Sequence, residues 1–354
     1  MLDDKNVLRQ YDPADTLGAV AHITQQMTYE PVIELGEFAP RAFSQIVLAG
    51  MGGSALAADM IRALTEGWLY VPLQVVKGYD LPGYAGADTL VIALSHSGNT
   101  EETLSCYEQA RARGCTVAAL SAGGQLVERA ARDSVAHVRV PSGAQPRMST
   151  VYHLRGILKL LEHFGVIDGD LFAQVASSAD WLASELVAWA PEQPESDNFA
   201  KQLAKTMMGK TPVFYAGELT YPLAYKWKIS WNESSKNLAF WGQYPEFNHN
   251  EFIGWSSHPI EKPFAVVDFR SALERPRIRE RMELSDRLLS GMRPKAEVIE
   301  LRGETLLQQL LWGLVLADMA SIYTAVLNGV NPEPVALVEK LKKELTPSYG
   351  DSAF

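Results

Sequence analysis

Short apolar segments alternate with longer amphipathic segments over the first 140 residues of the chain. Each apolar segment has the length of a buried strand, and helical patterns lie between them. They cover residues 45–50, 71–76, 88–94, 115–120 and 134–140, and read QIVLAG, VPLQVV, DTLVIAL, CTVAAL and SVAHVRV. This alternation predicts βαβ units, and therefore a parallel sheet with helices on both faces.

The remainder of the chain repeats this pattern after a mainly helical stretch. Residues 151–209 read as helices, interrupted by a loop at Pro191 and Pro194. Further apolar segments follow at 211–217, 264–270 and 296–303, separated by helical patterns. We therefore expect two α/β halves joined by helices, with these boundaries: a first domain over 1–150, a helical connection over 151–209, a second domain over 210–330 and a C-terminal helix within 331–354.

The composition of the chain limits the kinds of molecule that it is expected to bind. The chain has 354 residues, with 47% hydrophobic and 21% charged residues, which is ordinary for a globular protein of about two domains. Its 32 basic and 42 acidic residues give a net charge of −10. Nucleic-acid binding favours a basic face, so no nucleic-acid partner is expected. An anionic substrate must therefore be held by a local site.

The sequence also predicts a cytoplasmic location. The first residues lack the basic and apolar regions of a secretory signal. The longest apolar stretch, 305–329, contains Gln308, Gln309 and Asp318, so a buried helix is expected there and no membrane contact. Cys106 and Cys115 lie nine residues apart without a CxxC spacing, and both are expected to be reduced.

Two loops at strand ends carry the groups that bind anions. The segment 95–100 reads SHSGNT and lies between an apolar strand and the acidic start of a helix. Backbone N–H groups at a helix start bind anions, and hydroxyls add donors without charge. Ser95, Ser97 and Thr100 could alternatively cap this helix, but three hydroxyls around a glycine favour a ligand.

The other loop, at 50–55, reads GMGGSA and opens a helix after the first strand. It fits G-x-G-x-x-A, so a dinucleotide enzyme is one alternative. The second strand, however, ends in Val76-Lys77-Gly78, where a ribose-binding acid would be expected. Two anion loops that converge at strand ends favour a small phosphorylated molecule over a nicotinamide.

The motifs GMGGSALAADMIR (50–62) and SHSGNTEETL (95–104) resemble the sugar isomerase (SIS) domain, a phosphosugar-binding fold with a five-stranded parallel sheet. The stretch 217–255, with its WNESSK and PEFNHNE segments, resembles the bifunctional phosphoglucose/phosphomannose isomerases. This resemblance runs through nearly the whole chain, including the GAQPR segment at 143–147. It implies two SIS-type, doubly wound parallel-sheet domains (flavodoxin-like) with connecting helices. It also implies a substrate phosphate held by these residues of the two loops: Gly52, Gly53, Ser54, Ser95, Ser97 and Thr100.

Aldose–ketose isomerisation needs a base that moves a proton between neighbouring carbons, and a proton donor that opens the sugar ring. Glu233, within WNESSK, is the candidate base; an arbitrary helix glutamate would be a solvated residue, but the motif reverses that reading. His249 is the candidate for ring opening, because its pKa lies near neutrality and its loop is polar. His96 stands where the family usually has an aromatic residue, so packing or substrate contact is expected of it.

The resemblance assigns two further residues and an assembly. Arg147 matches the arginine that stabilises the enediolate, which needs a fixed cation. Lys342 matches a lysine of the C-terminal helix that assists ring opening, with Lys340 as the alternative one turn away. Related two-domain isomerases are dimers whose histidine comes from the other subunit. A homodimer with the active site near its interface is therefore expected.

The expected function is metal-independent interconversion of glucose 6-phosphate, and of mannose 6-phosphate, with fructose 6-phosphate. No cofactor is expected, and HExxH and CxxC motifs are absent from the sequence. Ser234 stands where the family more often has Asn, and Glu333 stands where it more often has Thr. The difference at Glu333 concerns activity on mannose 6-phosphate. The alternatives are a sugar-phosphate sensor without chemistry and an isomerase of another phosphosugar.

Overall fold

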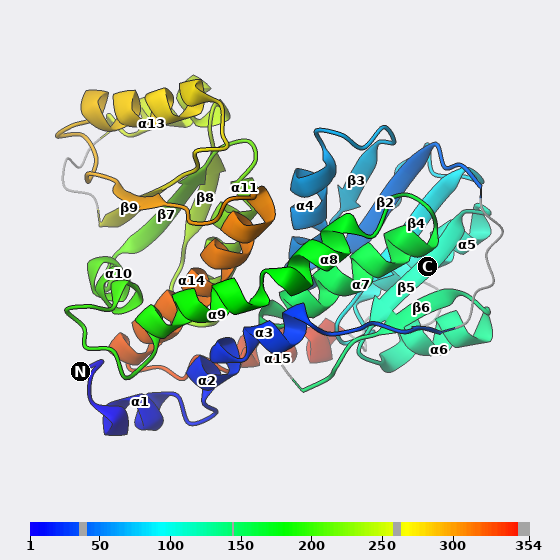
Figure 1. Cartoon of the computed structure of the whole chain (residues 1–354), viewed down its shortest axis with the longest axis horizontal. Helices are drawn as coiled ribbons and strands as arrows, with labels where there is room; N and C mark the ends of the chain where they lie inside the picture. Colours follow the sequence, from blue (N-terminus) through cyan, green and yellow to red (C-terminus); the bar gives the residue numbers. More distant parts are fainter. Residues whose placement is uncertain (35–40, 144, 258–262, 346–354) are drawn as a thin grey trace.

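The chain folds around two mainly parallel sheets that lie side by side, each flanked by helices (Figure 1). In this computed structural model the described residues are those of 1–354 apart from 35–40, 144, 258–262 and 346–354. The two sheets lie in the two ranges predicted to be α/β, and the helices between them fall largely within 151–209. The expected domain boundaries themselves stay predictions.

The first sheet has six strands in the order β1-β6-β5-β4-β2-β3. Five are parallel, at the positions where the sequence predicts strands, and β1 is an added antiparallel edge strand of two residues that the pattern does not reveal. Strand β4 is buried along its whole length, as expected for a parallel strand covered on both faces. The elements of this half are β1 Ile33–Glu34, β2 Gln45–Gly50, α4 Gly52–Thr65, β3 Leu73–Val76, β4 Thr89–Leu94, α5 Glu101–Ala112, β5 Thr116–Ser121, α6 Gly124–Arg132 and β6 Ala136–Arg139.

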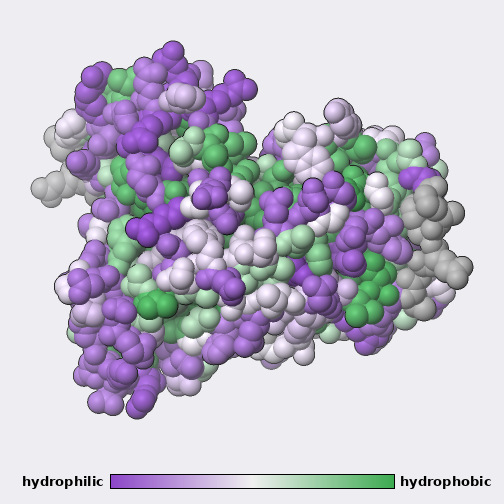
Figure 2. Space-filling model, in the orientation of Figure 1, coloured by the Kyte–Doolittle hydropathy of each residue, from purple (hydrophilic) through white to green (hydrophobic). Residues whose placement is uncertain are grey.

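The second sheet has four parallel strands in the order β10-β9-β7-β8. The sequence predicts three of them. It does not predict β8, because this short edge strand, FWGQ, has no buried residue and lacks the apolar pattern of a buried strand. The surface over α13, whose sequence is rich in Arg and Glu, is hydrophilic (Figure 2). The elements of this half are β7 Thr211–Ala216, α11 Tyr221–Glu233, β8 Phe240–Gln243, η3 Glu246–His249, α12 Glu251–Gly254, β9 Phe264–Arg270, α13 Pro276–Leu288 and β10 Glu297–Glu300.

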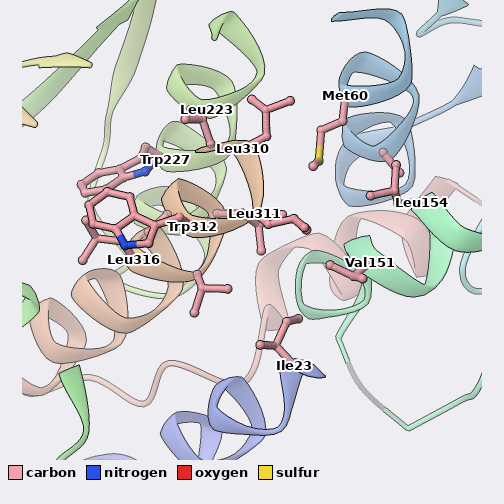
Figure 3. Close-up of a cluster of buried hydrophobic side chains, with 14 of the residues drawn as sticks. Ile23, Met60, Val151, Leu154, Leu223, Trp227, Leu310, Leu311, Trp312 and Leu316 are labelled. Atoms are coloured by element: carbon pink, nitrogen blue, oxygen red, sulfur yellow. The ribbon is translucent and has the colours of Figure 1, made fainter. Parts of the chain in front are cut away.

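A buried helix, α14, joins the two halves through one core. Leucine and tryptophan side chains of α14 meet those of α11 from the second half and approach Met60 of α4 and Leu154 of α7 on the first-half side (Figure 3). Within the described ranges α14 is the one helix long and apolar enough to cross a bilayer, and 94% of its most apolar window is buried in the protein. The remaining elements are α1 Lys5–Tyr11, α2 Thr16–Ala21, α3 Ile23–Met27, η1 Pro146–Met148, α7 Thr150–His163, α8 Asp170–Ser177, α9 Ala179–Leu186, η2 Val187–Trp189, α10 Phe199–Met207, α14 Leu306–Leu327 and α15 Ala336–Leu345.

Strand order fixes where a ligand can bind. Numbered along the chain within each half, the parallel strands run 2-1-3-4-5 in the first sheet and 2-1-3-4 in the second. In such sheets the order reverses between strands 1 and 3, and ligands bind in the crevice at their carboxyl ends. In the first sheet these strands are β2 and β4, so both predicted anion loops follow the switch point. In the second sheet they are β7 and β9.

A buried ion pair ties α11 to α14. Lys226 and Asp318 are almost fully buried, and their charged atoms lie 2.6 Å apart. Lys226 Nζ also donates to the carbonyl oxygen of Arg147 at 3.0 Å, and Ser230 Oγ donates to Asp318 Oδ1 at 3.0 Å. The pair therefore also fixes the backbone of the turn that carries Arg147.

Replacing Lys226 by Met is expected to lower the free energy of unfolding by about 3–5 kcal/mol, because Asp318 keeps a buried charge without a counterion. Urea unfolding followed by circular dichroism measures the change. The control is the double variant Lys226→Met/Asp318→Leu, which removes both charges and is expected to recover most of the loss. Equal losses in the single and double variants would contradict this account.

Candidate active site

The two predicted anion loops meet at the switch point of the first sheet. Ser54 Oγ accepts a hydrogen bond from the backbone N–H of His96 at 3.1 Å. Ser95 Oγ lies 2.8 Å from Thr100 Oγ1 and accepts from the N–H of Gly98 at 3.0 Å. Thr100, although it is the N-cap residue of α5, makes no capping hydrogen bond with its side chain. In the structure these hydroxyls therefore link the two loops and stabilise their conformation.

Exposure separates the six predicted phosphate residues into two groups. Ser54 and Ser95 are buried and belong to the framework of the loops, as does the buried Gly53. Gly52 and Ser97 are exposed and Thr100 is half-buried, so these three present groups at the surface of the crevice. A left-handed backbone at Gly52, with φ of 52°, places this residue in a conformation that glycine adopts without strain.

Gly53 brings the first loop against the turn that carries Arg147. A Cβ atom at Gly53 would lie 2.8 Å from the carbonyl oxygen of Pro146 and 2.9 Å from the backbone nitrogen of Arg147. Only glycine allows this approach of two backbones. The first anion loop therefore lies directly against the backbone of Pro146 and Arg147.

Arg147 is the centre of the site. Its guanidinium group is 2% exposed and donates from Nη1 to Glu233 Oε2 at 3.3 Å. It also donates from Nε to Ser234 Oγ at 3.2 Å, and from Nη2 to the carbonyl oxygens of Pro332 and Glu333 at 2.8 and 2.9 Å. The structure thus brings the predicted base, Glu233, to the predicted cation, and Ser234 takes part in the same network.

Glu233 is held at the end of a helix while its carboxylate stays accessible. It is the last residue of α11, and its side chain is 33% exposed. The buried face of α11, with Trp227 and Trp231, fixes the helix against the core. A fixed carboxylate beside a buried guanidinium can accept a proton from carbon while the cation stabilises the negative charge that develops.

Glu333 lies on the same network. Gln145 Nε2 donates to Glu333 Oε1 at 2.8 Å, and the Glu333 backbone carbonyl binds Arg147. Gln145, Arg147, Ser234 and Glu333 line a cavity of about 160 Å³. Glu333, which departs from the family pattern, therefore lies beside Arg147, the cation predicted to stabilise the enediolate. At this position it can affect the substrate.

His249 lies at the other end of the second sheet from Glu233. Glu233 ends α11, which returns to the amino ends of the strands, whereas His249 follows the carboxyl end of β8. Glu233 and His249 therefore lie toward opposite ends of β8, whose four residues span about 13 Å. His249 is exposed at the end of η3, which Asn248 anchors by donating to Ser285 Oγ at 2.9 Å. The hydrogen bonds and ion pairs described within one chain do not join His249 to Glu233.

The remaining predicted residues have different environments. Lys342 and Lys340 lie on α15, whose ten residues are all exposed, and their role in ring opening stays a prediction. His96 is buried, with Nδ1 3.2 Å from Nε2 of the buried His153, so its ring takes part in packing. Burial, with a smaller effect of His96, lowers the pKa of His153 to about 3, so His153 is neutral at physiological pH.

The second sheet carries an anion cradle that the protein itself fills. At its switch point, Glu274 Oε1 accepts from the N–H groups of Leu219 and Thr220 at 2.8 and 3.1 Å, and from Thr220 Oγ1 at 3.1 Å. A Cβ atom at Gly217 would lie 2.3 Å from the same oxygen. Glu274 is 7% exposed. A carboxylate of the chain thus occupies the helix start that corresponds to the phosphate loop of the first sheet.

Neither this role of Glu274 nor the contact of Lys226 with the Arg147 turn is predicted from the sequence. A signal for Glu274 exists: Gly217-Glu218-Leu219-Thr220 follows β7 as Met51-Gly52-Gly53 follows β2, and Glu274 comes after β9. For Lys226 there is no such signal, because its partner Asp318 is 92 residues away.

Two family models match the chain. The model described as "bacterial phospho-glucose isomerase C-terminal SIS domain" matches residues 196–345, and the SIS domain model matches residues 42–153. A bifunctional phosphoglucose/phosphomannose isomerase from Caldicellulosiruptor bescii is 33% identical over 85% of this chain and 89% of its own length. The protein of the same name from Aquifex aeolicus is 32% identical over 86% of this chain and 91% of its own length. The chain belongs to the bifunctional phosphoglucose/phosphomannose isomerase family.

The fold agrees with that of solved SIS proteins. A glucose-6-phosphate isomerase like protein from Thermus thermophilus superposes with a TM-score of 0.64, covering 97% of this chain and 98% of that one. Its sequence identity is 19%, so this likeness concerns the fold. The predicted architecture of two SIS-type α/β domains is confirmed, as is the predicted family.

Replacing Glu274 by Ala is expected to lower the free energy of unfolding by about 1–3 kcal/mol, because the N–H groups of Leu219 and Thr220 and the Thr220 hydroxyl lose their acceptor. Thermal and urea unfolding measure the change. Glu218→Ala is the matched control, since Glu218 is an exposed glutamate in the same loop and is expected to change stability little. Equal stability of the Glu274 and Glu218 variants would show that the cradle is not a stabilising contact.

Proposed function

We propose that this protein interconverts glucose 6-phosphate and mannose 6-phosphate with fructose 6-phosphate. The observation that carries this proposal is the contact between Glu233 and the buried Arg147, next to the two anion loops of the first sheet. Family membership supports it, because the curated relatives that match over most of the chain are named as isomerases of these two kinds.

The phosphate of the substrate binds where the two loops meet. Gly52, Ser97 and Thr100 offer backbone or hydroxyl donors there, and the starts of α4 and α5 add the partial positive charge of helix N-termini. The chain carries a net charge of −10, so these local donors provide the attraction for a phosphate dianion. The sugar then extends toward Glu233 along the Gly53–Arg147 contact.

Glu233 performs the proton transfer once the ring is open. It removes the proton from C2 of the aldose; the electrons of the C–H bond form the C1–C2 double bond, and the carbonyl electrons move to O1. The proton of the C2 hydroxyl moves to O1, and the same carboxyl group returns the carbon-bound proton to C1, so that C2 becomes the carbonyl carbon of the ketose. Between these steps the enediolate is negative, and Arg147 supplies a fixed positive charge beside it.

Mannose 6-phosphate uses the same base from the other face of C2, after rotation about the C2–C3 bond. Glu333 is the residue expected to help or hinder this rotation, since it lies against Arg147 and Gln145. A carboxylate there is larger and more polar than the threonine common in the family. We expect Glu333 to change the ratio of activity on mannose 6-phosphate to activity on glucose 6-phosphate, because Glu233 is the base for both substrates.

Replacing Glu233 by Gln is expected to lower kcat for both hexose 6-phosphates by at least about 10²-fold, because the amide cannot accept the proton. A coupled assay of fructose 6-phosphate formation, run with EDTA, measures it. Binding of fructose 6-phosphate, followed by calorimetry, is expected to persist. A sugar-phosphate sensor would bind without any turnover in the natural chain, and loss of activity on chelation would contradict a metal-independent reaction.

The proposal includes a cytoplasmic homodimer that completes the active site. His249 is exposed and remote from Glu233 within one chain, so ring opening at Glu233 needs the histidine of a second chain. Leu337, Leu341 and Leu345 lie four residues apart on α15 and are 84%, 58% and 37% exposed. Leu238, also exposed, lines a cavity of about 740 Å³ with Glu233 and Leu337. A second copy of this chain is the partner that covers this apolar surface.

Co-expression of Glu233→Gln with His249→Ala is expected to restore activity that neither variant has alone. In a heterodimer one site combines the intact Glu233 of one chain with the intact His249 of the other. With random pairing this gives about a quarter of wild-type activity. Each variant expressed alone is the control. Failure of the mixture to exceed the single variants would place both groups in the same chain.

A further inference from the structure

Lys236 has an unusual backbone for its residue type. It follows Glu233 by three residues, and its φ is 54°, in the left-handed region. A side chain with a Cβ atom is unfavourable there, whereas glycine adopts this conformation freely. Among the described residues only two other non-glycine residues, Asp15 and Ser134, have positive φ.

This backbone turns the lysine back toward the base. Lys236 Nζ donates to the carbonyl oxygen of Glu233, and to that of Pro332 at 3.2 Å. Arg147 donates to the same Pro332 oxygen at 2.8 Å. An ammonium and a guanidinium thus converge on one carbonyl beside Glu233. The described contacts use two of the three N–H groups of the ammonium.

Lys236 also faces open space. It lines the cavity of about 740 Å³ that contains Glu233, so a substrate at Glu233 is within reach of this side chain. Burial, and then the charge of Arg147, lower the pKa of Lys236 to about 8, while Glu233 and Glu333 act in the opposite direction. These three groups, from η1, α11 and the segment before α15, are the charges that set its titration.

We propose that Lys236 is a second active-site cation, which donates a hydrogen bond to the enediolate oxygens during isomerisation. The inference rests on the proposed function. As the substrate proton moves from carbon to Glu233, the carboxylate loses its negative charge and an oxygen of the substrate gains it. The ammonium stays protonated through this step, keeps its two backbone carbonyl contacts and donates its third N–H group to that oxygen. Its role is distinct from the ring-opening role expected of Lys342.

A simpler account is that Lys236 only caps α11, since lysines near a helix end commonly bind its last carbonyls. The two accounts differ in what Lys236→Gly does. A cap alone predicts lower stability and unchanged chemistry. An active-site cation at a strained position predicts the reverse, because glycine relieves the backbone while the charge is lost.

The experiment compares Lys236→Gly, Lys236→Arg and the wild type. Lys236→Gly is expected to keep or raise the melting temperature, and to lower kcat about 10²-fold with KM changed much less. Lys236→Arg keeps a cation and is expected to recover at least about tenfold of that loss. Ser134→Gly is the matched control: it relieves a left-handed backbone, with φ of 54°, at an exposed position outside the site and is expected to leave kcat unchanged.

The pH profile gives an independent measurement. A cation of pKa about 8 is present below that pH and lost above it in the free enzyme, so wild-type kcat/KM is expected to fall as pH rises through about 8. In Lys236→Arg this decline is expected to move up by at least about two pH units, and in Lys236→Gly it is expected to be absent. An unchanged decline in the Arg variant overturns the proposal, as does wild-type kcat in a folded Gly variant. Absence of wild-type turnover overturns the proposed function and, with it, this role.

Discussion

The hydrogen bonds of one buried guanidinium hold the candidate site together. Arg147 reaches the end of α11 through Glu233 and Ser234, and the segment before α15 through the carbonyls of Pro332 and Glu333. These segments lie far apart in the sequence and are joined through this side chain. A buried cation needs its partners, so each segment is also held in place by the others. The position of Glu233, the predicted base, therefore depends on all the hydrogen bonds of Arg147.

The backbone of Arg147 is constrained from two further sides. Gly53 lets the first anion loop touch the turn, and Lys226 of the buried ion pair binds its carbonyl oxygen. Because α11 and α14 pack in one core with α4 and α7, the two halves cannot shift without disturbing this turn. Packing of the two halves thus fixes the first anion loop relative to Arg147 and Glu233.

Much of this arrangement was predictable, because it follows from local patterns. Buried parallel strands such as β4 are continuous apolar runs, and loops at their carboxyl ends must share an edge of the sheet, which brings Ser54 near Ser95. The motif around Glu233 likewise predicts a base, through its resemblance to the family. Lys226 with Asp318 was not predictable, since the pairing depends on tertiary packing across 92 residues. The left-handed backbone at Lys236 was equally hidden, because nothing in a lysine signals positive φ.

Glu274 gives the two similar halves unequal tasks. Both sheets reverse strand order at the same place, and at the second of these places the backbone N–H groups before α11 donate to Glu274. The acceptor there is a side chain of the polypeptide itself. The second switch point is therefore an internal joint, in which the residue after β9 is bonded to the start of α11.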